Sequence, residues 1–183
     1  MSAIDDGTGF RLVMLIRHAE KPREPGEQAV DAFGRRDAAS LAVRGWQRAG
    51  ALATLFAAPP PPLRRPAALL AAGRSRAHAS TRPGDTLRPL AALLDLPVEE
   101  PPEGADAAEP LATAAAAHAG PVLVCARHEA LPAIARALGA REGVPETWPA
   151  DRYDVVWLVG EPGRPLRQWP QRLLAGDLAA PIA

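Results

Sequence analysis

The chain has 183 residues, 48% of them hydrophobic, and its 21 Lys and Arg residues balance its 21 Asp and Glu residues. This size and composition predict one globular domain over residues 1–183 and exclude a disordered chain. The zero net charge argues against a nucleic-acid binder or a protein that binds acidic membranes, because both usually carry an excess of basic residues.

The first predicted element is a strand over residues 12–16. These five apolar residues are typical of a strand buried on both faces, and they are followed directly by Arg17 and His18. Residues 19–39 lack periodicity and predict a loop that forms one wall of a pocket. Apolar residues at three- and four-residue spacing then predict a helix over residues 40–56. A run of prolines after it prevents the helix from continuing.

The middle of the chain alternates between short strands and helices. Residues 67–72 predict a strand, residues 85–94 a helix and Val98 a further short strand. Pro89 is compatible with the helix over residues 85–94 only near its start. Residues 105–119 are rich in alanine and predict another helix.

The last third of the chain repeats the first motif and then changes character. Residues 122–126 predict a second buried strand, which also ends in Arg-His, and residues 131–138 predict a helix. Residues 153–159 and 166–170 flank a Gly-Pro turn and predict an antiparallel hairpin. Together the elements predict a three-layer α/β/α sandwich with a mostly parallel central sheet and a C-terminal antiparallel hairpin.

The single cysteine, Cys125, excludes an intrachain disulfide and a metal cluster of cysteines. It lies in an apolar run, so we expect a small buried side chain rather than a nucleophile. The acidic first six residues do not follow the layout of a signal peptide. No apolar run in the sequence approaches the roughly 20 residues that cross a bilayer. We therefore expect a cytoplasmic protein without a membrane partner.

Two predicted parallel strands that end in Arg-His would bring Arg17, His18, Arg127 and His128 to one edge of the sheet. Open α/β sheets bind their ligands at this edge. Guanidinium groups match phosphoryl oxygens through paired, charge-assisted hydrogen bonds. A neutral imidazole can attack phosphorus near pH 7, and a second one can donate to a phosphoryl oxygen. The pattern therefore indicates phosphoryl chemistry that needs no metal and no cofactor.

Zinc binding by the histidines is the main alternative chemistry, because histidine is the commonest metal ligand. An arginine beside each histidine would repel a cation, however, and no two histidines have the close spacing of zinc ligands. A single Arg-His pair at a strand end is common and usually carries no function. We expect His78 to lie in a loop and His118 on a helix surface, both outside the site.

Four segments resemble the histidine phosphatase superfamily, which includes the phosphoglycerate mutases. Residues 17–22 (Arg-His-Ala-Glu-Lys-Pro) resemble its Arg-His-(Gly/Ala) signature, and residues 41–49 resemble its Leu-Thr-x-x-Gly-x-x-Gln-Ala helix start. Residues 80–86 resemble its Ser-x-Arg-x-x-(Gln/Glu)-Thr segment, and residues 122–129 resemble the strand that carries its second histidine. The order and spacing of the segments agree over most of the chain.

This resemblance implies roles for four residues. His18 would be the phosphorylated nucleophile, and Arg17, Arg82 and His128 would complete the phosphate pocket. It also implies a mostly parallel sheet with helices on both sides. The short distance from Arg82 to His128 leaves no room for the insertion found in the mutases. The chain therefore looks closer to the compact branch, which contains bacterial phosphohistidine phosphatases.

The sequence departs from the family pattern at three positions near these residues. Ala42 takes the place of a helix-capping threonine. Arg127 stands where the family often has glycine, so that it adds charge beside the pocket or points away. Lys21 replaces a small or hydroxyl residue and is a further candidate to bind phosphate.

The proton donor to the leaving group is left open by the sequence. Glu103 follows Arg82 at roughly the distance at which the donor follows this arginine in the family. Glu129 follows the second histidine, as a donor does in the acid phosphatase branch. Glu20, two residues after His18, is the third candidate. Compact members of the family can lack a dedicated donor.

The leading interpretation is a metal-independent phosphatase that hydrolyses a phosphate monoester or phosphoramidate through a phosphohistidine on His18. The alternatives are a module that binds a phosphorylated ligand without turnover and, with less support, a phosphomutase. The partner would be a small phosphorylated molecule or a phosphohistidine protein. The sequence indicates neither the substrate nor the oligomeric state.

Overall fold

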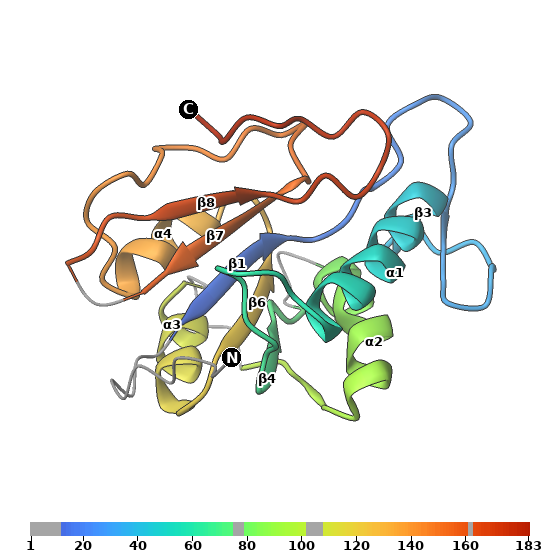
Figure 1. The fold of residues 1–183 in the computed structure, drawn as a ribbon. Helices are drawn as coiled ribbons and strands as arrows, with labels where there is room; N and C mark the ends of the chain where they lie inside the picture. The colour runs from blue at the N-terminus through green and yellow to red at the C-terminus, as the bar shows by residue number, and fades with distance from the viewer. Residues whose placement is uncertain (1–11, 75–78, 102–107, 161–162) are drawn as a thin grey trace.

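A computed structural model describes residues 12–74, 79–101, 108–160 and 163–183 of the chain. Its centre is a six-stranded sheet with the order β5-β4-β6-β1-β7-β8 (Figure 1). Strands β5, β4, β6 and β1 are parallel, whereas β7 is antiparallel to both of its neighbours. The bounds of the strands are β1 Val13–Arg17, β4 Ala68–Ala71, β5 Val98–Glu99, β6 Val122–Ala126, β7 Val155–Val159 and β8 Arg167–Pro170.

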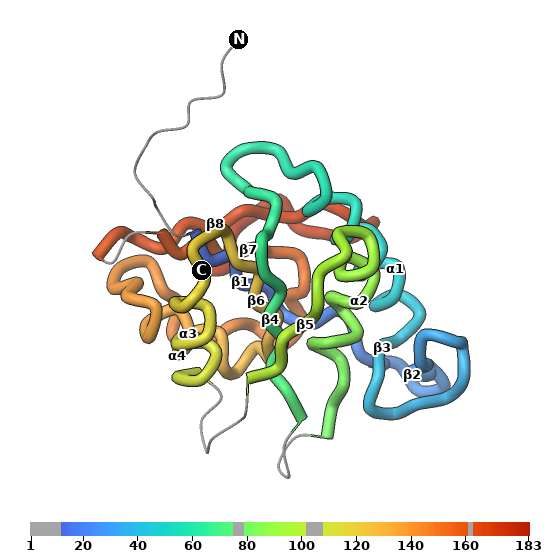
Figure 2. The backbone as a smooth tube through the Cα atoms, turned by 90° about the horizontal axis from the view of Figure 1, so that it is seen from below, coloured from blue at the N-terminus to red at the C-terminus, as the bar shows by residue number. Residues whose placement is uncertain are grey.

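Four helices in the described ranges cover the two faces of this sheet. Helices α1 (Val43–Ala57) and α2 (Arg82–Leu94) lie on one side of the strands, and α3 (Ala108–Ala117) and α4 (Leu131–Ala137) lie on the other, as Figure 2 shows. The three-layer α/β/α prediction is confirmed, including the antiparallel hairpin of β7 and β8. None of the helices in the described ranges is both long and apolar enough to cross a membrane.

The side chains of the central strands alternate between two separate cores. In β1, Met14 and Ile16 pack toward the side of α1 and α2, together with Leu52 and Phe56 of α1. Leu15 points to the other side, into the core that contains residues of α3 and α4. Because both faces of the strands are buried, their sequences are continuous apolar runs rather than alternating ones.

The two strands that end in Arg-His are direct neighbours. Strand β1 pairs with β6 in a parallel register that places Val13 beside Val122 and Arg17 beside Ala126. The backbone N–H of His18 continues the ladder with a hydrogen bond of 3.0 Å to the carbonyl of Ala126. The expectation that both ends meet at one edge of the sheet is therefore confirmed.

The predicted loop over residues 19–39 contains more structure than its sequence indicates. Strands β2 (Ala29–Val30) and β3 (Leu41–Ala42) form a small antiparallel sheet beside the start of α1. Two-residue strands carry too little periodicity to be recognised in a sequence.

Helix α2 begins at Arg82, three residues before the predicted start at Asp85. Pro83 fits in the first turn, where a backbone N–H has no partner within the helix. Pro89 therefore lies in the helix interior rather than near its start, which corrects the prediction. The Asp85 side chain stabilises the early start by accepting a hydrogen bond of 2.7 Å from the hydroxyl of Thr81.

Helix α1 approaches the chain after His18 so closely that Gly45 is required. A Cβ atom at this position would collide with the backbone carbonyl oxygen of Glu20. We expect Gly45→Ala to lower the free energy of unfolding by about 1–3 kcal/mol, the usual effect of overpacking. Gly50→Ala is the matched control in the same helix, because a Cβ there meets no atom within 4 Å. This change should stabilise by up to about 1 kcal/mol. Equal effects in urea unfolding would contradict the prediction.

Candidate active site

The carboxyl ends of β1 and β6 open into a cavity of about 260 Å³. Four of the residues expected to form a phosphate pocket line it, and Lys21, Arg127 and Glu129 line it as well. The complete lining is Arg17, His18, Lys21, Ala79, Ser80, Arg82, Arg127, His128 and Glu129. Side chains from distant parts of the sequence therefore gather here, with an excess of positive charge.

His18 is 5% exposed, and a short contact fixes the tautomer of its ring. The Nδ1 atom lies 2.8 Å from the carbonyl oxygen of Ala19. A carbonyl can only accept, so Nδ1 carries the proton and Nε2 carries a lone pair. Burial, together with the charges of Arg17 and Arg82, lowers the pKa of His18 to about 3. The ring is therefore neutral at pH 7 and able to act as a nucleophile at Nε2.

Arg17 is held in place by the loop before β7. Its Nη1 donates to three backbone carbonyls, those of Pro149 at 3.3 Å, Ala150 at 2.8 Å and Arg152 at 3.0 Å. The Nε atom is buried and has no hydrogen-bond partner within the described ranges. A buried guanidinium donor without a partner is costly, and a ligand oxygen would satisfy it.

Tyr153 completes this support for Arg17, and the sequence reasoning missed it. Its hydroxyl accepts a hydrogen bond of 3.1 Å from Arg17 Nη2, and the Arg17 guanidinium lies 3.8 Å from the centre of its ring. The guanidinium of Arg23 lies 4.8 Å from the same ring. Tyr153 is also 6.2 Å from the His18 ring, centre to centre. The sequence predicts only that Tyr153 begins a strand, because no local pattern links it to residues so far away.

Arg82 reaches the cavity from the first turn of α2. Its Nε donates to the carbonyl of Ser40 at 2.9 Å, and its Nη2 donates to the carbonyl of Ala38 at 2.8 Å. The hydroxyl of Thr86 connects this turn to the chain after β1. It accepts a hydrogen bond of 2.8 Å from the backbone N–H of Ala19 and donates one of 2.7 Å to the carbonyl of Arg82. These bonds fix the position of Arg82 relative to His18.

His128, two residues after the end of β6, lines the cavity and contacts Glu129. Its Nδ1 lies 2.9 Å from the Glu129 carboxylate, which is itself largely exposed. Burial lowers the pKa of His128, and Arg17 and Lys21 add to the decrease, whereas the carboxylate of Glu129 opposes it. Because the carboxylate accepts the Nδ1 proton, Nε2 is the atom left for a ligand.

The other residues singled out in the sequence lie elsewhere. Cys125 is buried in the core, and burial raises the pKa of its thiol, which fits a packing role. His118 follows α3 and lies 3.3 Å from the carboxylate of Glu99, away from the cavity lining. Glu103 and His78 lie outside the described residues. In the described part of the chain, no group of three or more His, Cys, Asp or Glu side chains has an arrangement that could hold a metal ion.

Glu20, the third candidate proton donor, is engaged in a buried ion pair. Its carboxylate accepts from Arg48 Nη2 at 2.8 Å and from Arg48 Nε at 3.0 Å. Arg48 is only 2% exposed, and its Nη2 also contacts Asp177 at 2.7 Å. The bonds to Asp177 and Glu20 raise the pKa of Arg48 in spite of its burial. In the family pattern that residues 41–49 resemble, the position of Arg48 is a glutamine. The sequence therefore did not predict the ion pair that Arg48 forms.

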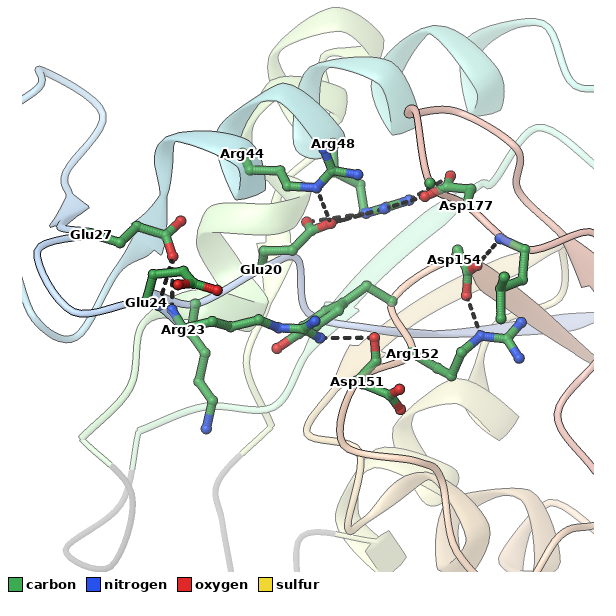
Figure 3. Close-up of a pocket in the computed structure, with 14 residues that line it drawn as sticks. Glu20, Arg23, Glu24, Glu27, Arg44, Arg48, Asp151, Arg152, Asp154 and Asp177 are labelled. Atoms are coloured by element: carbon green, nitrogen blue, oxygen red, sulfur yellow. Dashed lines mark hydrogen bonds and ion pairs between the residues drawn. The ribbon is translucent and has the colours of Figure 1, made fainter.

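The residues of this ion pair line a second, larger cavity of about 580 Å³. Figure 3 shows Glu20, Arg48 and Asp177 along one wall, with Arg23, Asp151 and Arg152 along another. Arg23 runs along this second wall and donates to the carbonyl of Asp151 at 2.8 Å. Lys21 lines both cavities.

Comparisons with known proteins do not identify the chain. No protein-family model matches it, and no curated protein does.

Proposed function

We propose that the protein is a metal-independent phosphatase that hydrolyses a phosphate monoester or phosphoramidate through a phosphohistidine on His18. The proposal assigns the chain to the histidine phosphatase superfamily, as its sequence motifs indicate. The observation that supports it most is the state of His18, whose Nδ1 is hydrogen-bonded to Ala19 while Nε2 is free of its proton. This nucleophile lines a cavity with Arg17, Arg82 and His128.

In the first step, Nε2 of His18 attacks phosphorus in line and the leaving group departs with the bonding electrons. The Ala19 carbonyl then stabilises the positive charge that the ring acquires, because it accepts the Nδ1 proton. Arg17 offers its Nε–H to an equatorial oxygen, and Arg82 and His128 surround the others. Catalysis would depend on positioning and on charge placed around the transferred group, as is general for phosphoryl transfer.

In the second step, water attacks the phosphohistidine on the side opposite Nε2 and releases inorganic phosphate. The guanidinium groups of Arg17 and Arg82 stabilise this transition state as well, because the phosphoryl oxygens occupy the same place in both steps. The substrate belongs to the class of small phosphorylated molecules or phosphohistidine proteins. Hydrolysis of an aryl phosphate in the presence of a chelator tests the proposal. Activity that requires an added metal would contradict it.

Arg82→Ala should lower kcat by about 10²–10³-fold, the usual loss when one donor to a transition state is removed. Arg88→Ala is the control: it lies on the same helix, is largely exposed and contacts Asp85 at only 3.7 Å. The thermal unfolding midpoint should be measured for both, because Arg82 also bonds the carbonyls of Ala38 and Ser40. An unchanged kcat in a folded Arg82→Ala protein would exclude this residue from the phosphate pocket.

A further inference from the structure

Lys21 connects the two cavities at the edge of the sheet. It lines the smaller one, of about 260 Å³, together with His18 and His128. It also lines the larger one, of about 580 Å³, and no other described residue belongs to both linings. A substrate with its phosphoryl group beside His18 and its organic part in the larger cavity would place the bond between them next to Lys21.

The larger cavity has the size and the chemistry to receive a polar organic group. Its volume lies within the range of about 300–1,000 Å³ that is typical of ligand pockets. Charged residues form most of its lining, and several of them neutralise each other: Arg48 pairs with Glu20 and Asp177, and Arg152 pairs with Asp154 at 2.7 Å. An alcohol that carries further polar groups suits these walls, whereas a lipid does not.

Two candidate carboxylates among the described residues, Glu20 and Glu129, have partners of their own. Glu20 accepts three hydrogen bonds from Arg48, with distances from 2.8 to 3.1 Å. Both of its carboxylate oxygens are thus occupied by the Arg48 guanidinium, and Glu20 does not line the cavity that contains His18. Glu129 lies 2.9 Å from Nδ1 of His128 and serves to orient that ring.

The following step rests on the proposed function. We propose that the ammonium group of Lys21 donates a proton to the oxygen of the leaving alcohol, and that the larger cavity receives this alcohol. Lys21 is then a catalytic residue, and the substrate is the phosphate monoester of a polar alcohol. Lys21 is three residues after His18 in the sequence and lines the same cavity.

The protons and electrons of both steps balance. The lone pair of His18 Nε2 forms the N–P bond, the P–O bond breaks, and its electron pair goes to the alcohol oxygen. That oxygen takes a proton from Lys21, which becomes a neutral amine. In the second step, the amine takes a proton from the attacking water, the O–P bond forms, and the electrons of the N–P bond return to Nε2. Inorganic phosphate and the starting enzyme result.

The test compares leaving groups of different basicity. A weakly basic leaving group such as 2,4-dinitrophenolate departs without receiving a proton. The more basic phenolate departs much faster when an acid protonates its oxygen. Lys21→Met should therefore lower kcat/KM for phenyl phosphate by about 10²–10⁴-fold, the usual contribution of general acid catalysis. It should leave kcat/KM for 2,4-dinitrophenyl phosphate nearly unchanged. Arg65→Met is the control for the loss of a surface cation, because it precedes β4 and lies at the opposite edge of the sheet.

Two carboxylate variants decide between Lys21 and the other candidates. Glu129→Gln and Glu103→Gln should not show a loss that depends on the leaving group. If Lys21→Met lowers kcat/KM equally for both substrates, Lys21 binds phosphate instead, and the proposal is overturned. An unchanged kcat/KM for both substrates would overturn it as well. A leaving-group-dependent loss in Glu103→Gln or Glu129→Gln alone would also overturn it. If wild-type protein hydrolyses neither substrate, the proposed function itself fails.

The larger cavity is tested separately by Leu178→Trp. Leu178 lines this cavity, is 51% exposed and does not line the smaller one. The larger side chain should raise KM for phenyl phosphate and leave the inhibition constant of inorganic phosphate unchanged. An unchanged KM would show that the organic group lies elsewhere.

Discussion

His18→Ala should lower the kcat of phosphate ester hydrolysis by about 10⁶-fold, which is the size of the loss when a covalent enzyme is deprived of its nucleophile. The reason is that the lone pair of Nε2, which the bond from Nδ1 to Ala19 keeps available, forms the bond to phosphorus. The measurement is the steady-state rate with an aryl phosphate in the presence of a chelator. The variant should keep its affinity for inorganic phosphate, because Arg17, Arg82 and His128 are unchanged.

His118→Ala is the matched control for this prediction. His118 is a partly exposed histidine that contacts Glu99 and does not line the cavity. Its removal should leave kcat unchanged. A His18→Ala protein with full activity would show that the phosphoryl group is never carried by this residue, whatever the effect of the other substitutions.

Arg48→Met should be the most destabilising of the substitutions considered, with a loss of about 3–5 kcal/mol in the free energy of unfolding. Methionine has a similar length but leaves the carboxylates of Glu20 and Asp177 buried without their cation. Both carboxylates have side chains less than 10% exposed, at 7% and 4%. Urea unfolding, followed by circular dichroism, measures the loss.

Arg44→Met tests whether the effect comes from burial. Arg44 also contacts Glu20, at 3.5 Å, but its side chain is 44% exposed. Exposed ion pairs contribute about 0–1 kcal/mol, so this variant should be almost as stable as the wild type. Similar losses in both variants would mean that the buried network around Arg48 has no special role in stability.

The sequence predicted the features that depend on local pattern. The apolar runs before Arg17 and Arg127 are buried on both faces, so that they were recognisable as central strands, and β1 and β6 are indeed parallel neighbours. Because neighbouring parallel strands end at the same edge, the meeting of His18 and His128 in one cavity could be expected. The position of Arg82 could be expected only from the resemblance to a known family.

The features that were missed depend on contacts between distant parts of the chain. Arg17 is bonded to the loop around Tyr153, 132 to 136 residues away in the sequence. Arg48 and Asp177 are separated by 129 residues. Neither pairing has a local signature, since an arginine in a helix is usually exposed and a tyrosine beside a strand is usually part of the core. Burial and long-range partners had to be seen in three dimensions.

The most direct measurement is rapid quenching of the wild-type protein during turnover of 2,4-dinitrophenyl phosphate, followed by mapping of the phosphate by mass spectrometry. If a phosphohistidine forms, the phosphate should be found on the peptide that contains His18. This phosphopeptide should be stable in base and lose its phosphate in acid, and its amount should rise within the first turnover. Steady turnover with no phosphate on this peptide at any quench time, or with phosphate on another residue, would contradict it.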